Sequence, residues 1–205
     1  MAGVLKKLAK EGIENASDFL KSFRKKTYYH VSPNPDIEEF KINQLSFFDN
    51  EKRGAIYFTS DPKYAEAIME ELDNQLGDIE NLPYTTYPVK VKKGKIFNFN
   101  DKQEVKKLEA ALSNEGYNLG PFLPIKYGAY ETLEQPEIQK ILKEQGYRGY
   151  MTSEPGTVGL FYPEDVRSIF AKFNPEDAKS GNILKAVVPV GGLNLLGATN
   201  GESEN

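Results

Sequence analysis

Three residues of this chain carry side chains suited to chemistry at a sugar ring. His30 is the only histidine among 205 residues, Tyr57 lies in a second apolar stretch, and Glu154 precedes a third. A neutral imidazole can hydrogen-bond a ribose hydroxyl, and a tyrosine ring can stack on a flat heteroaromatic ring. A carboxylate can stabilise a cationic sugar centre. Together these groups would suit cleavage of a nicotinamide–ribose bond through an oxocarbenium-like transition state.

Each of the three residues also has a structural alternative. A lone His30 beside two tyrosines on a strand is typical of a packed imidazole, and Tyr57 between Ile56 and Phe58 is typical of a core residue. Glu154 precedes Pro-Gly, a pair typical of a solvated turn. The residue types alone leave both interpretations open.

Composition excludes several other classes of function. The chain has no cysteine, which excludes disulfides, zinc ribbons and a thiol nucleophile, and a single histidine argues against a transition-metal site, so we expect no metal. No GxGxxG, GxxxxGK[ST] or GxSxG motif occurs, although a dispersed Ser-His-Asp triad stays open. The net charge of −4 argues against a general nucleic-acid binder, and no apolar run is long enough to span a bilayer.

Periodicity and turn residues predict an α+β fold with a mainly antiparallel, split sheet and flanking helices. The strands come in clusters rather than in strict alternation with helices, which favours antiparallel pairing. Ser60 or Asp61 is expected to cap one helix, and Gly116 and Gly146 to end two others. The predicted strands are 27–31, 55–59, 84–92, 95–98, 147–152, 157–162 and 166–172, and the predicted helices are 62–76, 102–116 and 134–146.

The sequence divides into three parts at residues 26 and 175. Residues 1–26 form a basic N-terminal segment with an amphipathic helix predicted over 3–24, either packed on the domain or docked to a membrane or partner. Residues 27–175 form the main domain, with a Pro/Gly/aromatic loop at 119–130. Residues 176–205 hold an apolar, Gly-rich stretch at 183–198 and a polar tail. The apolar stretch could cover the domain, contact a membrane or bind a partner.

Several short motifs in the main domain resemble a known family. Tyr29-His30-Val31-Ser32 and Gly54-Ala55-Ile56-Tyr57-Phe58-Thr59-Ser60-Asp61-Pro62 resemble the first two motifs of ADP-ribosyltransferases of the diphtheria-toxin and poly-ADP-ribose-polymerase type. The order of motifs resembles still more closely the ADP-ribosyltransferase-like domains of phage and prophage polyvalent proteins. The further matching segments are Tyr87-Pro88-Val89, Gly146-Tyr147-Arg148-Gly149, Leu160-Phe161-Tyr162 and Pro163 to Ile169. The resemblance covers roughly residues 27–175.

This resemblance implies an NAD+ cleft and transfer of ADP-ribose to a protein or nucleic-acid acceptor. It implies that His30 contacts the nicotinamide ribose, that Tyr57 packs on nicotinamide and that Glu154 is the catalytic carboxylate that stabilises positive charge on the ribose, with Glu131 and Glu134 in reserve. It implies contacts to NAD+ from His30, Val31, Ser32, Tyr57, Thr59 and Tyr64.

At three positions the chain departs from the family pattern. Val31 replaces a common glycine, Ile68 replaces a second stacking tyrosine that Tyr64 could substitute, and Thr157 occupies the place of the polymerase-type glutamate. The alternative hypothesis is therefore a non-catalytic virion protein, or one ejected with the phage genome, that retains the fold. These alternatives imply a location in the host cytoplasm or the virion, with NAD+, an acceptor or virion proteins as partners.

Overall fold

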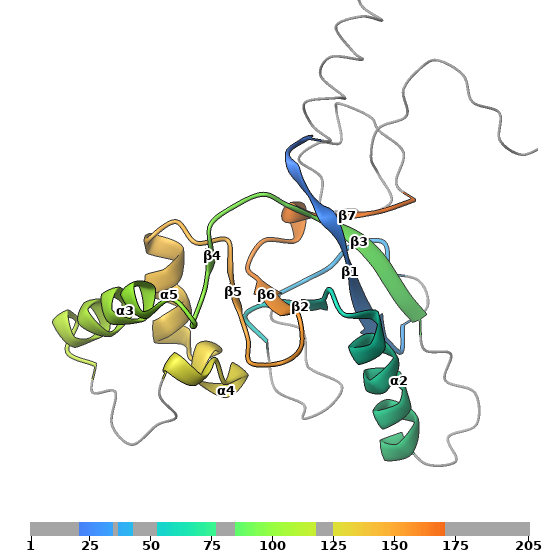
Figure 1. The fold of residues 1–205 in the computed structure, drawn as a ribbon, viewed down its shortest axis with the longest axis horizontal. Coiled ribbons are helices and arrows are strands. Elements are labelled where there is room, and N and C mark those ends of the chain that lie inside the picture. Colours follow the sequence, from blue (N-terminus) through green and yellow to red (C-terminus); the bar gives the residue numbers. More distant parts are fainter. Residues whose placement is uncertain (1–20, 35–36, 43–52, 77–84, 118–124, 171–205) are drawn as a thin grey trace, which may run out of the picture.

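The computed structural model describes residues 21–34, 37–42, 53–76, 85–117 and 125–170, which form one seven-stranded sheet with helices beside it (Figure 1). The strands are β1 (Phe23–Ser32), β2 (Ile56–Thr59), β3 (Thr85–Lys92), β4 (Ile96–Phe97), β5 (Gly149–Met151), β6 (Thr157–Leu160) and β7 (Val166–Ser168). The α-helices are α2 (Pro62–Leu76), α3 (Lys102–Asn114), α4 (Tyr130–Leu133) and α5 (Pro136–Glu144), with short 3-10 turns at Ile125–Tyr127 and Pro163–Asp165.

The strands lie in the order β4-β5-β6-β2-β1-β3-β7. β4 and β5 run parallel, and every other neighbouring pair is antiparallel. The predicted α+β class with a mainly antiparallel sheet is thereby confirmed. β1 and β2 share one register pair, Tyr29 with Thr59, whereas β1 and β3 share seven. The pairing between β1 and β2, near the middle of the sheet, is therefore short.

Each face of the sheet carries its own apolar cluster, because alternate side chains of a strand point to opposite sides. On one face, Phe97, Tyr150 and Phe161 pack with the buried residues of α3 and α5. On the other face, Phe58 and Val89 belong to a second cluster. The helices α3, α4 and α5 gather at the β4–β5 side of the sheet, and α2 lies at the β1 side (Figure 1).

The helix caps predicted at Asp61, Gly116 and Gly146 are confirmed. Asp61 caps α2, because its side chain accepts hydrogen bonds from the Lys63 and Tyr64 amides at 3.0 and 3.4 Å. Gly116 and Gly146 end α3 and α5 with φ angles of 83° and 78°, in the left-handed region that glycine enters without strain. These caps explain why helix boundaries were predictable here.

Two predictions of secondary structure are wrong in part. The helix predicted over 134–146 begins only at Pro136, as α5, because Gln135 is extended (ψ 130°) and a residue before proline is disfavoured in the α region. α4 also occupies the end of the predicted 119–130 loop. Phe23 and Arg24, the end of the helix predicted over 3–24, belong instead to β1. Residues 3–20 of that predicted helix and the 183–198 stretch lie outside the described residues.

Candidate functional site

The strands that carry His30 and Tyr57, β1 and β2, lie beside β6, the strand that follows Glu154. The turn before β6, which contains Glu154, is fixed to the end of β2 by hydrogen bonds. Thr59 Oγ1 donates to the Pro155 carbonyl at 2.7 Å, and the Ser60 amide donates to the Gly156 carbonyl at 3.0 Å. Glu154 is thereby held near the start of α2.

His30 joins β1 to β2 through its side chain. Its Nδ1–H donates to the Tyr57 carbonyl at 2.9 Å, which fixes the tautomer because a carbonyl can only accept. The ring packs against Phe40 and Phe58, with centroid distances of 4.9 and 5.5 Å. Burial lowers the pKa of His30, outweighing the opposing hydrogen bond, so the imidazole is neutral at pH 7.

Tyr57 belongs to a polar network on the opposite face. Its hydroxyl donates to Glu134 Oε1 at 2.6 Å, and the Tyr150 hydroxyl, also 2.6 Å away, donates to Tyr57 in turn since Tyr57 has only one proton. Arg53 forms an ion pair with the same Glu134 carboxylate. The Gln139 side-chain amide adds to the network by donating a hydrogen bond from Nε2 to the Tyr150 hydroxyl at 3.4 Å. Burial, followed by its acidic and phenolic neighbours, raises the pKa of Tyr57.

Gly159 makes room for this network. It lies on β6 opposite both Tyr57 of β2 and Tyr150 of β5. A Cβ at Gly159 would approach Tyr150 Cζ to 2.8 Å, closer than real Cβ atoms come to a neighbour. The missing side chain therefore lets the Tyr150 ring lie beside Tyr57.

The structure does not bring the side chains of His30 and Tyr57 together. The pairing of Tyr29 with Thr59 places His30 opposite Phe58, and the His30–Phe58 ring contact agrees. Because Tyr57 precedes Phe58 on the strand, its side chain leaves the other face. The link between His30 and Tyr57 is the bond to the backbone carbonyl.

Glu154 lies in a group of polar side chains from three segments. The Tyr64 hydroxyl of α2 is hydrogen-bonded to it, and Glu71 of α2 and Glu131 of α4 are close enough to perturb it electrostatically. Burial, then these two like charges, raises the pKa of Glu154, against the effect of the Tyr64 bond. Burial and Glu154 raise the pKa of Tyr64 to about 12. A positive charge placed here would relieve the repulsion among the carboxylates.

The remaining predicted contact residues mostly hold the backbone. Ser32 is buried, and its hydroxyl accepts a hydrogen bond from the Asn34 amide at 3.1 Å. Thr59 is buried and uses its hydroxyl for both Pro155 and the Asp61 amide. Val31 is half-buried and pairs with Thr86 of β3, whose hydroxyl contacts Met69 of α2. α2 therefore covers the face that carries Val31 and Tyr57.

At the positions that depart from the family pattern, the structure shows ordinary packing. Thr157 is buried at the start of β6 and donates to the Pro155 carbonyl at 3.2 Å, while Ile68 is half-buried on α2. Of the reserve acids, Glu131 lies near Glu154 and Glu134 binds Tyr57. No signal in the sequence indicated Tyr150 as a partner of Tyr57 or Arg53 as a partner of Glu134.

Comparisons with known proteins add no relative. A scan against protein-family models and searches of curated proteins and of solved structures find no match. In the described ranges, no group of three or more His, Cys, Asp or Glu side chains is arranged to hold a metal ion. Among the described helices, none has both the length and the apolar composition needed to cross a bilayer.

Proposed function

We propose that this chain is an ADP-ribosyltransferase-like protein of the phage type, which binds NAD+ and transfers ADP-ribose to a macromolecular acceptor. The observation that carries the proposal is the adjacency of β1, β2 and β6, which puts the His30 and Tyr57 motifs next to the turn that presents Glu154. This adjacency agrees with the arrangement that the sequence resemblance implies.

In the proposed reaction, the bond between C1′ of the ribose and nicotinamide breaks, and nicotinamide leaves with the electron pair. An acceptor nucleophile then forms the new bond to C1′ and loses its proton. Glu154 would stabilise the positive charge that develops on the ribose, because Glu131 and Glu71 already make its surroundings negative. The Tyr64 hydroxyl orients the Glu154 carboxylate.

His30 has a positioning role in this proposal. Its ring lies among Phe40, Phe58 and Tyr87, and its Nδ1–H fixes the Tyr57 carbonyl. The bond ties β1 to β2 beside their single register pair. His30 would thus set the separation of the two strands that carry Val31 and Tyr57, rather than react itself.

The test is calorimetric titration with NAD+ together with mass detection of nicotinamide release. The folded wild type is expected to bind NAD+ and to release nicotinamide. Glu154→Gln should slow release by about 10²–10³-fold with little change in NAD+ affinity, because the lost charge acts mainly in the transition state. Tyr64→Phe should slow it by less. Glu66→Gln, exposed on the same helix, is the matched control. Failure of folded protein to bind millimolar NAD+ would refute the proposal.

A second candidate function is that of a non-catalytic virion or ejected protein. The observation that favours it is the internal use of the motif side chains: the Tyr57 hydroxyl is bound to Glu134 and Tyr150, and the His30 ring packs on Phe58. On this hypothesis, Tyr57→Phe lowers stability and no variant alters NAD+ chemistry. Recovery of the protein in purified phage particles, with no binding of NAD+, would support this second function.

A further inference from the structure

A group of cationic side chains lies where the start of β1 meets the end of β3. We call this group the basic corner; its members are Arg24, Lys25, Lys26, Lys92 and Lys93. The two segments are joined at the backbone, since the Lys93 amide donates to the Ser22 carbonyl at 2.6 Å and Phe23 pairs with Lys92. Arg24 also donates to the Gly94 carbonyl at 3.0 Å. In Figure 1 the blue start of β1 lies beside the green connection from β3 to β4.

A neighbouring lysine holds the backbone that presents these charges. The register between β1 and β3 shifts between Phe23 and Thr27, so Lys25 and Lys26 lie in an irregular stretch of β1. Lys90 donates to the Lys25 carbonyl at 2.6 Å and to Thr27 Oγ1 at 3.0 Å. Lys90 therefore serves the fold, whereas Lys25 and Lys26 are exposed.

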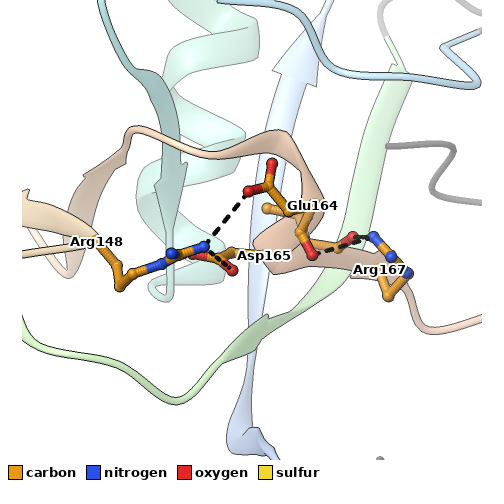
Figure 2. Close-up of polar contacts among 5 residues, drawn as sticks. Arg148, Glu164, Asp165 and Arg167 are labelled. Carbon is orange, nitrogen blue, oxygen red and sulfur yellow. Dashed lines mark hydrogen bonds and ion pairs between the residues drawn. The ribbon is translucent and has the colours of Figure 1, made fainter. Parts of the chain in front are cut away.

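The amino groups of Lys25, Lys26, Lys92 and Lys93 have no carboxylate and no hydrogen-bond acceptor among the described residues. Glu164 and Asp165 are already bound by Arg148 (Figure 2). The Arg148 side chain packs close to Gly94 beside the corner. Four cations thus lie on adjoining segments with no ion pair in the part of the chain that the structure describes, although the net charge of the chain is −4. Such a concentration of one sign attracts a polyanion locally.

We propose that the basic corner binds the phosphate backbone of nucleic acid without reading its sequence. Lysine binds phosphate as a point charge, and no amide or aromatic side chain of the corner is available to read bases. A membrane surface fits less well, because peripheral binding also needs apolar side chains. The exposed large apolar residues of the described chain are Tyr117, Tyr127, Ile169 and Phe170, none of which belongs to the corner.

This inference does not depend on NAD+ chemistry. Lys26 lies four residues before His30 on β1, about 13 Å away at the usual rise of a strand, and no corner residue is among the groups that shift the pKa of Glu154 or Tyr57. Loss of nucleic-acid binding and loss of transfer can therefore be observed separately.

The test is fluorescence anisotropy of a DNA duplex of about 20 base pairs, titrated with the full chain at several salt concentrations near 50–200 mM. Four phosphate contacts predict a slope of log affinity against log salt between about −3 and −4. Lys25→Gln with Lys26→Gln should reduce this slope by about 2. Lys106→Gln with Lys107→Gln, exposed on α3, removes the same charge elsewhere and should leave the slope unchanged.

A second control replaces Lys6, Lys7 and Lys10 by Gln, because these cations lie outside the described residues. Three outcomes overturn the proposal: no binding by folded wild type at low salt, equal losses in the corner and α3 variants, or loss only in the N-terminal variant. Binding to vesicles of equimolar phosphatidylserine and phosphatidylcholine, without binding to the duplex, would also overturn it in favour of a membrane surface.

Discussion

At the scale of single residues, the state of His30 follows from its neighbours. The aromatic rings around it remove water, which disfavours the imidazolium, and the Tyr57 carbonyl only partly offsets that loss. The folded-state pKa therefore lies below the unfolded value of about 6.5. Between those two pH values the unfolded chain binds more protons than the folded chain. The contribution of His30 to the stability of the fold is therefore complete above pH 6.5 and is lost as the pH falls through the folded-state pKa.

Because His30 is the only histidine, its pKa can be measured without assignment. We expect the single imidazole Cε1–H signal of the folded protein to titrate below pH 6.5 in proton NMR, since burial penalises the charged ring. The same signal in urea-denatured chain should titrate near about 6.5. A folded-state midpoint above the denatured one would contradict the packing described for this ring.

The sequence predicted the strands of His30 and Tyr57 and the turn of Glu154, because each has local signals within a few residues. It could not predict the partners of Tyr57. Glu134 lies 77 residues away and Tyr150 lies 93 residues away, and only the packing of α4 and the register of β2, β6 and β5 decide which side chains meet. Nor could it show that His30 and Tyr57 leave opposite faces, because that depends on the register between β1 and β2.

At the scale of elements, Arg148 joins the start of β5 to the turn that precedes β7. Arg148 stands just before β5 and binds Asp165 with two hydrogen bonds of 2.6 Å, with Glu164 at 3.5 Å (Figure 2). It also lies over the Tyr162 ring at 4.0 Å. Asp165 is only 2% exposed, so its carboxylate depends on this partner. Asp165 lies 17 residues from Arg148, so no local pattern in the sequence indicated this pair.

Arg148→Ala should lower the free energy of unfolding by roughly 3 kcal/mol, because it leaves a buried carboxylate unpaired. Arg148→Lys should cost less, since it keeps the charge and loses the two-pronged geometry. Urea denaturation of both variants would measure these differences. Lys107→Ala, an exposed change on α3, should stay within about 0.5 kcal/mol of wild type. Equal stability of Arg148→Ala and wild type would show that the Arg148–Asp165 ion pair contributes nothing to the free energy of unfolding.

At the scale of the whole molecule, the sheet consists of two groups of strands. β1, β3 and β7 form one group, and β2, β6, β5 and β4 form the other. The backbone joins them through a single register pair, and the His30 bond and a shared apolar cluster, which includes Val89 of one group and Phe58 of the other, add to the connection. The short backbone pairing favours separate opening of the two groups, whereas the shared cluster couples them.

Hydrogen exchange of core variants would show whether the groups open separately. Val89→Ala on β3 should cost roughly 1.5–3 kcal/mol and accelerate exchange mainly in β1, β3 and β7. Leu108→Ala on α3, fully buried beside the other group, should act mainly on β5 and β4. Uniform acceleration over the entire sheet in both variants would mean that the sheet unfolds as one unit.

The strand order also bears on how the chain folds during its synthesis. β2 is central in the finished sheet, yet its neighbour β6 follows it by roughly 100 residues. At a translation rate of about 5–20 residues per second, one edge of β2 waits for roughly 5–20 seconds before its partner leaves the ribosome. During that interval an apolar strand with unpaired backbone groups is open to pairing with other chains. Overexpression should therefore give less aggregation when translation of residues 60–160 is fast.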